Sequence, residues 1–263
     1  MQQMSHKIQG KVTMEKILTK VYDMGAQTDA EVTVAMIHGI SSDATTFDGL
    51  LEFLRGKRAL SKVRYVCFDL LGHGKTPADD ENLDYDFDDQ ISALRRSIKS
   101  LELSTPLVLL GHSMGTLIVT RYADKYPGDV SGLVLCSPPI YTEKDLDNPA
   151  MKMAMRAFED AVRAKNRDIV GTKAFQNSLR KIVLKRDNYE KFCDISVPTT
   201  IIYGEMDQII ASYNIPKLLQ TNKNIKAEKT IGRHGVTQDK FVPIEHALVD
   251  LAAEVVKEDD ETL

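Results

Sequence analysis

The stretch from Pro106 to Val119, PLVLLGHSMGTLIV, places a serine between two glycines at the junction of two apolar runs. The first run is typical of a buried strand and the second of a helix, so the chain must turn sharply at Ser113. Glycines at 111 and 115 remove Cβ atoms that would clash in so tight a bend, and we expect a positive φ at the corner. The Ser113 hydroxyl would then lie at the carboxyl edge of a sheet, close to helix N–H groups that favour an anion. The spacing predicts a nucleophilic serine.

A serine hydroxyl is a weak nucleophile until a histidine takes its proton and a carboxylate orients that histidine. After a strand–serine–helix corner, the acid and the histidine follow in that order, on loops at later strand ends. The expected strand 197–204 runs into Glu205 and Asp207, and His234 follows the weaker strand 225–232. On physical grounds either acid could orient the imidazole. His234 is the preferred base.

The remaining polar residues near strand ends have structural interpretations. His38 and His73 lie in glycine-flanked loops, where we expect them to orient the loop backbone. His112 is adjacent to the nucleophile and diverges from it at the turn, and His246 falls on the polar face of the last helix. Asp69 also ends a strand; we expect it to accept hydrogen bonds from loop backbone, with a relocated acid as the alternative.

Short apolar runs alternate with segments of helical period along most of the chain. The expected strands are 31–39, 62–72, 105–111, 130–137, 197–204 and, more weakly, 225–232. Continuous apolar strands separated by helices predict an α/β fold, with a mostly parallel sheet covered on both faces. The N-terminal segment 7–24 alternates instead, which predicts an antiparallel edge hairpin.

One segment interrupts this alternation. Residues 140–195 contain no expected strand, only helical stretches around 151–168 and 173–192. We therefore predict a core made of 1–139 and 196–263, with 140–195 as a helical lid. The segment 243–257 places four apolar residues on one face and is expected to close the core as an amphipathic helix: Ile244, Leu248, Leu251 and Val255.

Five stretches together resemble the α/β-hydrolase superfamily, in the group of small serine esterases, lipases and thioesterases with a helical lid. They are IHGISSDATTFDGL, FDLLGHGKT, LLGHSMGTLIV, IIYGEMDQII and GRHGV. The resemblance implies that Ser113 is the nucleophile, Asp207 the acid and His234 the base. It also implies that the backbone N–H groups of Ile40 and Met114 form the oxyanion hole.

The sequence departs from that pattern at one position. The family often has glycine or a small residue directly before the catalytic histidine, whereas this chain has Arg233.

The resemblance implies hydrolysis of a carboxylic ester or thioester of a small to medium, partly apolar substrate. Hydrolysis of a C–C bond or a lyase reaction is the first alternative, because the same triad serves those reactions on this fold. A ligand sensor without turnover is the second.

No cofactor or metal is expected. The glycines of Gly72–Lys75 lack the spacing of a phosphate-binding loop, and no His, Cys or carboxylate cluster has metal-ligand spacing. The net charge of −4 gives no general attraction to nucleic acid, and no apolar run approaches the length of a membrane span. Three widely spaced cysteines and the lack of a signal peptide favour a cytoplasmic protein, and we expect it to be a monomer or homodimer.

Charge is unevenly distributed along the chain. Between Glu143 and Lys191, 12 basic residues against 8 acidic ones give +4, which leaves −8 for the remainder. Two interpretations stay open for the lid: attraction of an acidic substrate or a lipid surface, or simply two solvated helix faces. Met151, Met153 and Met155 could line an adaptable acyl pocket or fill a core.

Overall fold

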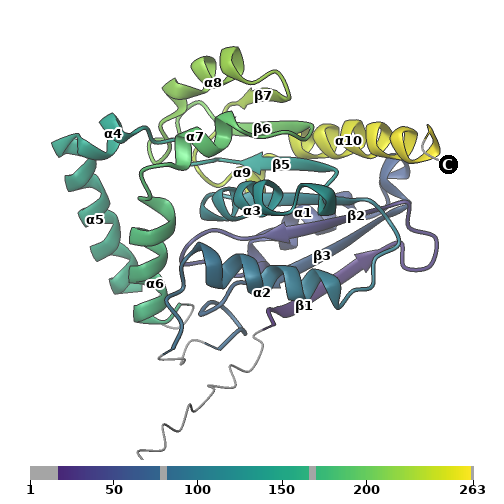
Figure 1. The fold of residues 1–263 in the computed structure, drawn as a ribbon, viewed down its shortest axis with the longest axis horizontal. Coiled ribbons are helices and arrows are strands. Elements are labelled where there is room, and N and C mark those ends of the chain that lie inside the picture. Colours follow the sequence, from purple (N-terminus) through teal and green to yellow (C-terminus); the bar gives the residue numbers. More distant parts are fainter. Residues whose placement is uncertain (1–16, 78–81, 166–169, 262–263) are drawn as a thin grey trace, which may run out of the picture.

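A seven-stranded sheet runs through the protein in the computed structural model, which describes residues 17–77, 82–165 and 170–261 (Figure 1). Its strands are β1 (Thr19–Gly25), β2 (Val32–Ile37), β3 (Val63–Asp69), β4 (Leu107–His112), β5 (Gly132–Cys136), β6 (Thr199–Gly204) and β7 (Ile225–Thr230). The strand order is β1-β3-β2-β4-β5-β6-β7, and every neighbouring pair is parallel except β1 with β3. The predicted α/β fold with a mostly parallel sheet is confirmed.

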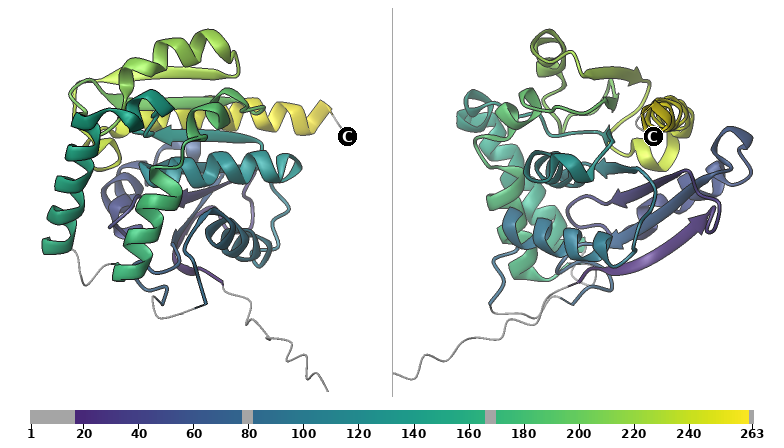
Figure 2. Two further views of the ribbon diagram at one scale, coloured as in Figure 1. Left: turned by 60° about the vertical axis from the view of Figure 1, so that its left-hand side comes forward. Right: turned by 45° about the vertical axis from the view of Figure 1, so that its right-hand side comes forward.

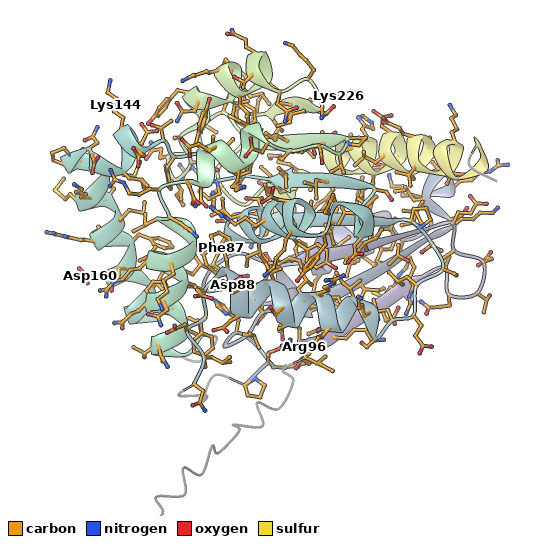
Figure 3. The ribbon with its side chains drawn as sticks, viewed as in Figure 1. Phe87, Asp88, Arg96, Lys144, Asp160 and Lys226 are labelled. Carbon is orange, nitrogen blue, oxygen red and sulfur yellow. The ribbon has the colours of Figure 1, made fainter. Side chains whose placement is uncertain are left out.

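The centre of the sheet is buried on both faces, whereas its β7 edge is polar. Every residue of β2, β4 and β5 is buried, which explains why their sequences are continuously apolar. At the edge, β7 buries Ile225 and exposes Lys226, Glu228 and Lys229 (Figure 3 labels Lys226).

Helices cover the two faces and create two separate cores (Figure 2). Their bounds are α1 (Asp48–Leu54), α2 (Phe87–Lys99), α3 (Met114–Lys125), α8 (Ile215–Thr221), α9 (Val236–Asp239) and α10 (Phe241–Glu261), with 3-10 turns η1 (Ala44–Phe47), η2 (Arg58–Leu60), η3 (Pro127–Asp129) and η5 (Ser212–Asn214). Apolar residues of α2, α3 and α8 share one core, and those of α1 and α10 share the other. The face that α10 presents to the sheet is the predicted one: Ile244, Leu248, Leu251 and Val255 are all buried.

The segment between β5 and β6 is helical, and Figure 1 shows α5 and α6 side by side at one end of the sheet. It contains α4 (Glu143–Asp147), α5 (Pro149–Lys165), α6 (Thr172–Ser178), a π-helical turn η4 (Leu179–Val183) and α7 (Asn188–Cys193). The helical stretch predicted around 173–192 is present but interrupted, because the π-helical turn ends at Val183 and α7 begins at Asn188. The Asn188 side chain donates to the carbonyls of Ile182 and Val183, 2.7 and 3.3 Å away. These carbonyls would accept backbone N–H groups if the helix continued, so Asn188 takes the place of the next turn.

The structure tests only part of the antiparallel hairpin predicted over residues 7–24. Residues 7–16 of the expected hairpin lie outside the described residues, and β1 pairs antiparallel with β3 at the sheet edge. The guanidinium of Arg64 on β3 donates to both carboxylate oxygens of Asp23 at 2.8 Å, which fixes the register of this pair. Within the described ranges, every helix is too short or too polar to cross a bilayer.

The corner between β4 and α3 has the predicted strained backbone. Ser113 adopts φ 51° and ψ −119°. A Cβ atom on Gly115 would lie 2.2 Å from the carbonyl oxygen of Ile37 on β2, and one on Gly111 would lie 2.6 Å from the backbone of Gly115. Both glycines are therefore required by backbone packed against backbone, where no side chain can move aside.

Substituting Gly115 should be costly for this reason. Gly115→Ala forces Cβ into the Ile37 carbonyl, and we expect the free energy of unfolding to fall by about 1–3 kcal/mol or more, as in other overpacked sites. Urea unfolding would measure it. Gly128→Ala is the matched control, since a Cβ there meets nothing within 4 Å and should change stability by less than about 0.5 kcal/mol. Equal stability of the two variants would contradict this account of the corner.

Candidate active site

Three residues at the carboxyl ends of β4, β6 and β7 form one hydrogen-bonded chain. His234 Nε2 lies 2.9 Å from Ser113 Oγ, and His234 Nδ1 lies 2.8 Å from Asp207 Oδ2. Ser113 and His234 are 121 residues apart in the sequence, and Asp207 and His234 are 27 apart, so the fold brings the three together. This arrangement can activate the serine hydroxyl, with His234 as the group that takes its proton.

The two acids considered from the sequence have different surroundings. The Asp207 side chain is fully buried against His234, and its Oδ1 accepts a hydrogen bond of 2.9 Å from the Ile209 N–H. Burial alone raises the pKa of Asp207, but the hydrogen bond and the charge of His234 outweigh it and hold this pKa below its ordinary value. Glu205 instead lies 3.6 Å from Lys229 on β7 and is exposed to solvent.

The loop that carries Asp207 is fixed from two sides. A Cβ on Gly204 would lie 2.4 Å from the Gly232 carbonyl oxygen, so the end of β6 packs directly on the backbone beside His234. On the other side, the buried Tyr141 hydroxyl donates to the Ile209 carbonyl. The loop therefore holds Asp207 in place by backbone contacts close to the carboxylate.

A second cluster ties the same loop to the start of the helical segment. Asn214 donates to the Ile140 carbonyl at 2.9 Å and to Asp145 Oδ2 at 2.8 Å. Tyr213 donates to the other oxygen of Asp145 at 2.6 Å. Asp145 also completes the capping box of α4 with Thr142, so one carboxylate joins the helix start to the Asp207 loop.

His112 positions His234 rather than competing with it. Its Nε2 donates a hydrogen bond of 3.0 Å to the His234 carbonyl, and the two rings lie 5.2 Å apart between centroids. Burial, and then the neighbouring His234, lower the pKa of His112 to about 4, so its ring stays neutral. This contact is not predictable from the sequence, because nothing in the motif indicates a partner 122 residues away.

The loop after β2 is held by the residues expected to be structural. His38 Nε2 accepts a hydrogen bond of 3.0 Å from the Leu70 N–H. The Asp69 carboxylate accepts from the N–H groups of Ala44 and Lys75 at 2.8 and 2.7 Å, as expected for a loop-organising acid. His73 lies in the tight turn that follows β3, with its ring 5.3 Å from that of His38.

A cavity of about 100 Å³ opens at Ser113 and His234. Gly39 and Ile40 line it from the loop after β2, and a Cβ atom on Gly39 would lie 3.0 Å from Ser113 Cβ. Met114 is the first residue of α3, so its N–H belongs to the unpaired amino end of that helix. Four side chains of the helical segment close the cavity: Met155, Phe158, Leu179 and Val183.

In the part of the chain that the structure describes, no group of three or more His, Cys, Asp or Glu residues is placed to hold a metal ion. The Gly72–Lys75 stretch forms the expected turn, with positive φ at Gly72 and Gly74. Its backbone packs around Asp69, because a Cβ on Gly74 would lie 2.3 Å from that carboxylate.

Comparison with known proteins places the chain in a family. The family model described as Serine aminopeptidase, S33 (Hydrolase_4) matches residues 28–191, well over half of the chain. Probable lysophospholipase BODYGUARD 1 of Arabidopsis thaliana is 32% identical over 113 residues, which cover 43% of this chain and 24% of that protein. The chain thus spans about a quarter of the length of this curated relative.

Two further comparisons extend over nearly the whole chain. Monoacylglycerol lipase ABHD6 of Mus musculus is 24% identical over 282 residues, covering 92% of this chain and 82% of that protein. The solved structure of an esterase from Exiguobacterium antarcticum superimposes with a TM-score of 0.66 at 20% identity, covering 93% of this chain and 100% of that one. The structural likeness shows that the two chains share a fold.

The buried histidines should make folding stability depend on pH. Burial, before other causes, lowers the pKa of His38 and of His112 to about 4, whereas an unfolded histidine titrates near 6.5. Between these values the unfolded chain binds more protons, so the free energy of unfolding should fall as the pH is lowered from about 6.5 towards 4. Each histidine contributes at most about 1.4 kcal/mol per pH unit. Urea unfolding at a series of pH values would measure the slope.

His38→Gln tests the source of that slope. The glutamine oxygen can still accept from Leu70, but it does not titrate, so the slope should become shallower even if the variant is less stable. The exposed His246, changed to Gln, should leave the slope as it is. An unchanged slope in His38→Gln would show that its titration does not govern acid stability.

Proposed function

We propose that this chain, which belongs to the Serine aminopeptidase, S33 family of the α/β-hydrolase superfamily, acts as an esterase- or lipase-like enzyme. Its substrate is then a carboxylic ester or thioester of small to medium size and partly apolar character. The observation that carries the proposal is the Ser113–His234–Asp207 chain, with distances of 2.9 and 2.8 Å, opening into a cavity with apolar walls.

The first half of the reaction acylates Ser113. Its Oγ attacks the carbonyl carbon while His234 Nε2 takes the hydroxyl proton, and Asp207 stabilises the imidazolium that forms. The developing oxyanion accepts from the backbone N–H groups of Ile40 and Met114, each such donor typically worth about 3 kcal/mol. The positive end of α3 adds to this stabilisation, since Met114 is its first residue.

The second half releases the acid. His234 gives its proton to the departing alcohol or thiol, which breaks the bond to the carbonyl carbon and leaves an acyl-Ser113. Water then attacks the acyl carbon while His234 takes its proton. The tetrahedral intermediate collapses as the bond to Ser113 Oγ breaks, His234 returns the proton to that oxygen, and a carboxylic acid is released. These steps need no cofactor.

We further propose that residues 140–195 act as the lid of a core made of 1–139 and 196–263. Support comes from the four apolar side chains that this segment contributes to the wall of the Ser113 cavity. The name of the mouse relative, monoacylglycerol lipase, is that of an enzyme acting on a carboxylic ester, which agrees with an ester substrate here.

Ester hydrolysis should depend on Ser113. With a p-nitrophenyl ester series of increasing acyl length, Ser113→Ala should lower kcat by at least about 10⁴-fold while the protein stays folded by circular dichroism. The acyl length with the highest kcat/KM will indicate the size of the acyl-binding pocket. Full activity of Ser113→Ala would contradict the assignment. No turnover together with fluorophosphonate labelling at Ser113 would favour a C–C hydrolase or lyase, and no labelling would favour a sensor.

Substitutions of Asp207 and Glu205 should have clearly different effects on kcat. Asp207→Asn leaves a neutral group that cannot stabilise the imidazolium, and we expect kcat to fall by about 10³- to 10⁴-fold. Glu205→Gln loses only the exposed ion pair with Lys229 and should keep kcat within about twofold. A larger loss in Glu205→Gln than in Asp207→Asn would assign the acid to Glu205 instead.

A further inference from the structure

A second and larger cavity, of about 330 Å³, lies within the helical segment next to the active site. It opens between α4, α5 and the π-helical turn, and we call it the lid cavity. Met155 and Leu179 line both the lid cavity and the cavity at Ser113. The two spaces are therefore adjoining, with these two side chains as their shared wall.

The lid cavity combines an apolar lining with a basic rim. Its apolar lining consists of Leu146, Met151, Met155, Leu179 and Leu184. Its charged residues are Asp147, Lys152, Arg156, Glu159, Arg180 and Arg186, four basic against two acidic. An apolar pocket with several positive charges at its rim suits a ligand that has an apolar body and a negative end.

The basic residues of the rim are not equivalent. Arg186 already donates to both oxygens of Asp147, at 2.7 and 3.2 Å, and Lys152 lies 3.6 Å from that carboxylate. Arg156 and Arg180 are both exposed, and neither forms an ion pair with any residue in the described ranges. Two guanidinium groups beside apolar surface are thus left to bind an anion.

The short segment from Leu179 to Leu184 contributes to both cavities. Leu179 and Val183 line the cavity at Ser113, whereas Arg180 and Leu184, each one residue further on, line the lid cavity. The segment includes the π-helical turn, and such turns widen a helix by one residue and often occur at functional sites. The shared wall is also adaptable, since Met155 is only half-buried and its unbranched side chain has several rotatable bonds.

We propose that the lid cavity binds the distal end of the substrate, and that this end is an anionic carboxylate or phosphate held by Arg156 and Arg180. The substrate class is then an ester whose apolar chain passes Met155 and joins the anion to the carbonyl at Ser113. Guanidinium groups suit this role because they form paired hydrogen bonds with either anion. The proposal rests on the proposed hydrolase function and names its substrate more closely.

The test compares two ester series of matched length. One consists of mono-p-nitrophenyl esters of dicarboxylic acids, whose far end is a carboxylate, and the other of uncharged p-nitrophenyl alkanoates. At the best chain length, Arg156→Gln/Arg180→Gln should lower kcat/KM for the anionic ester by about tenfold or more and leave the neutral ester within about twofold. Added salt should weaken the same preference.

Lys144→Gln is the matched control. Lys144 belongs to the same helical segment, is exposed, and does not line the lid cavity; Figure 3 shows it pointing away from the molecule. It removes one positive charge from the segment without touching the cavity. Equal losses for anionic and neutral esters in the arginine variant, or an equal loss of preference in Lys144→Gln, would overturn the proposal.

Binding to the inactive Ser113→Ala protein separates this proposal from the proposed function. Calorimetry with decanoate and decyl phosphate should show binding that falls about tenfold or more in the added arginine variant, with decanol unaffected. Failure to bind either anion would overturn the lid cavity as an anion site even if esters are hydrolysed. Loss of binding to phosphatidylglycerol vesicles, with ester preference unchanged, would assign these arginines to a lipid surface instead and overturn the proposal.

Discussion

The chain passes from strand β4 to helix α3 within the single residue Ser113, and the rest of the site depends on this constraint. The Ser113 N–H donates to the Cys136 carbonyl at the end of β5, 2.9 Å away. On the other side, Gly115 approaches the Ile37 carbonyl at the end of β2 so closely that no side chain fits between them. The corner is thus held by the strands on both of its sides, and its positive φ is maintained by the sheet itself.

From that corner the remaining groups are fixed through backbone atoms. His112, directly before the serine, holds the carbonyl of His234, and Tyr141 holds the carbonyl of Ile209 beside Asp207. Asp145 connects this loop to the beginning of α4. The helical segment therefore starts from the same hydrogen-bonded cluster that holds Asp207, so a shift of its first helix and a shift of the acid are mechanically linked.

The sequence predicts much of this arrangement because two of its signals are local. Fully buried parallel strands need continuous apolar residues, so β2, β4 and β5 could be located directly, and the flanking glycines indicated the corner at Ser113. The choice between Glu205 and Asp207 was not local. On physical grounds both carboxylates were open and the family resemblance favoured Asp207; the tertiary structure places Asp207 against His234 and Glu205 beside Lys229.

Other features could not have been predicted from periodicity. The π-helical turn over Leu179–Val183 differs from an ordinary helix only in hydrogen bonds that span one more residue, and the apolar period does not reveal this difference. The lid cavity depends on how α4, α5 and that turn are placed together, and the charge count of the segment could not show which basic residues are paired. In both cases the missing information is three-dimensional packing.

The polar edge strand β7 also affects how these molecules meet one another. An open strand with apolar side chains invites a strand from a second molecule to extend the sheet, which is a common route to aggregation. Here such a strand would lie beside Lys226, Glu228 and Lys229 and would have to bury their charges. The sheet therefore ends, on the side of β6 and β7, in a charged strand that disfavours pairing with a strand from a second molecule.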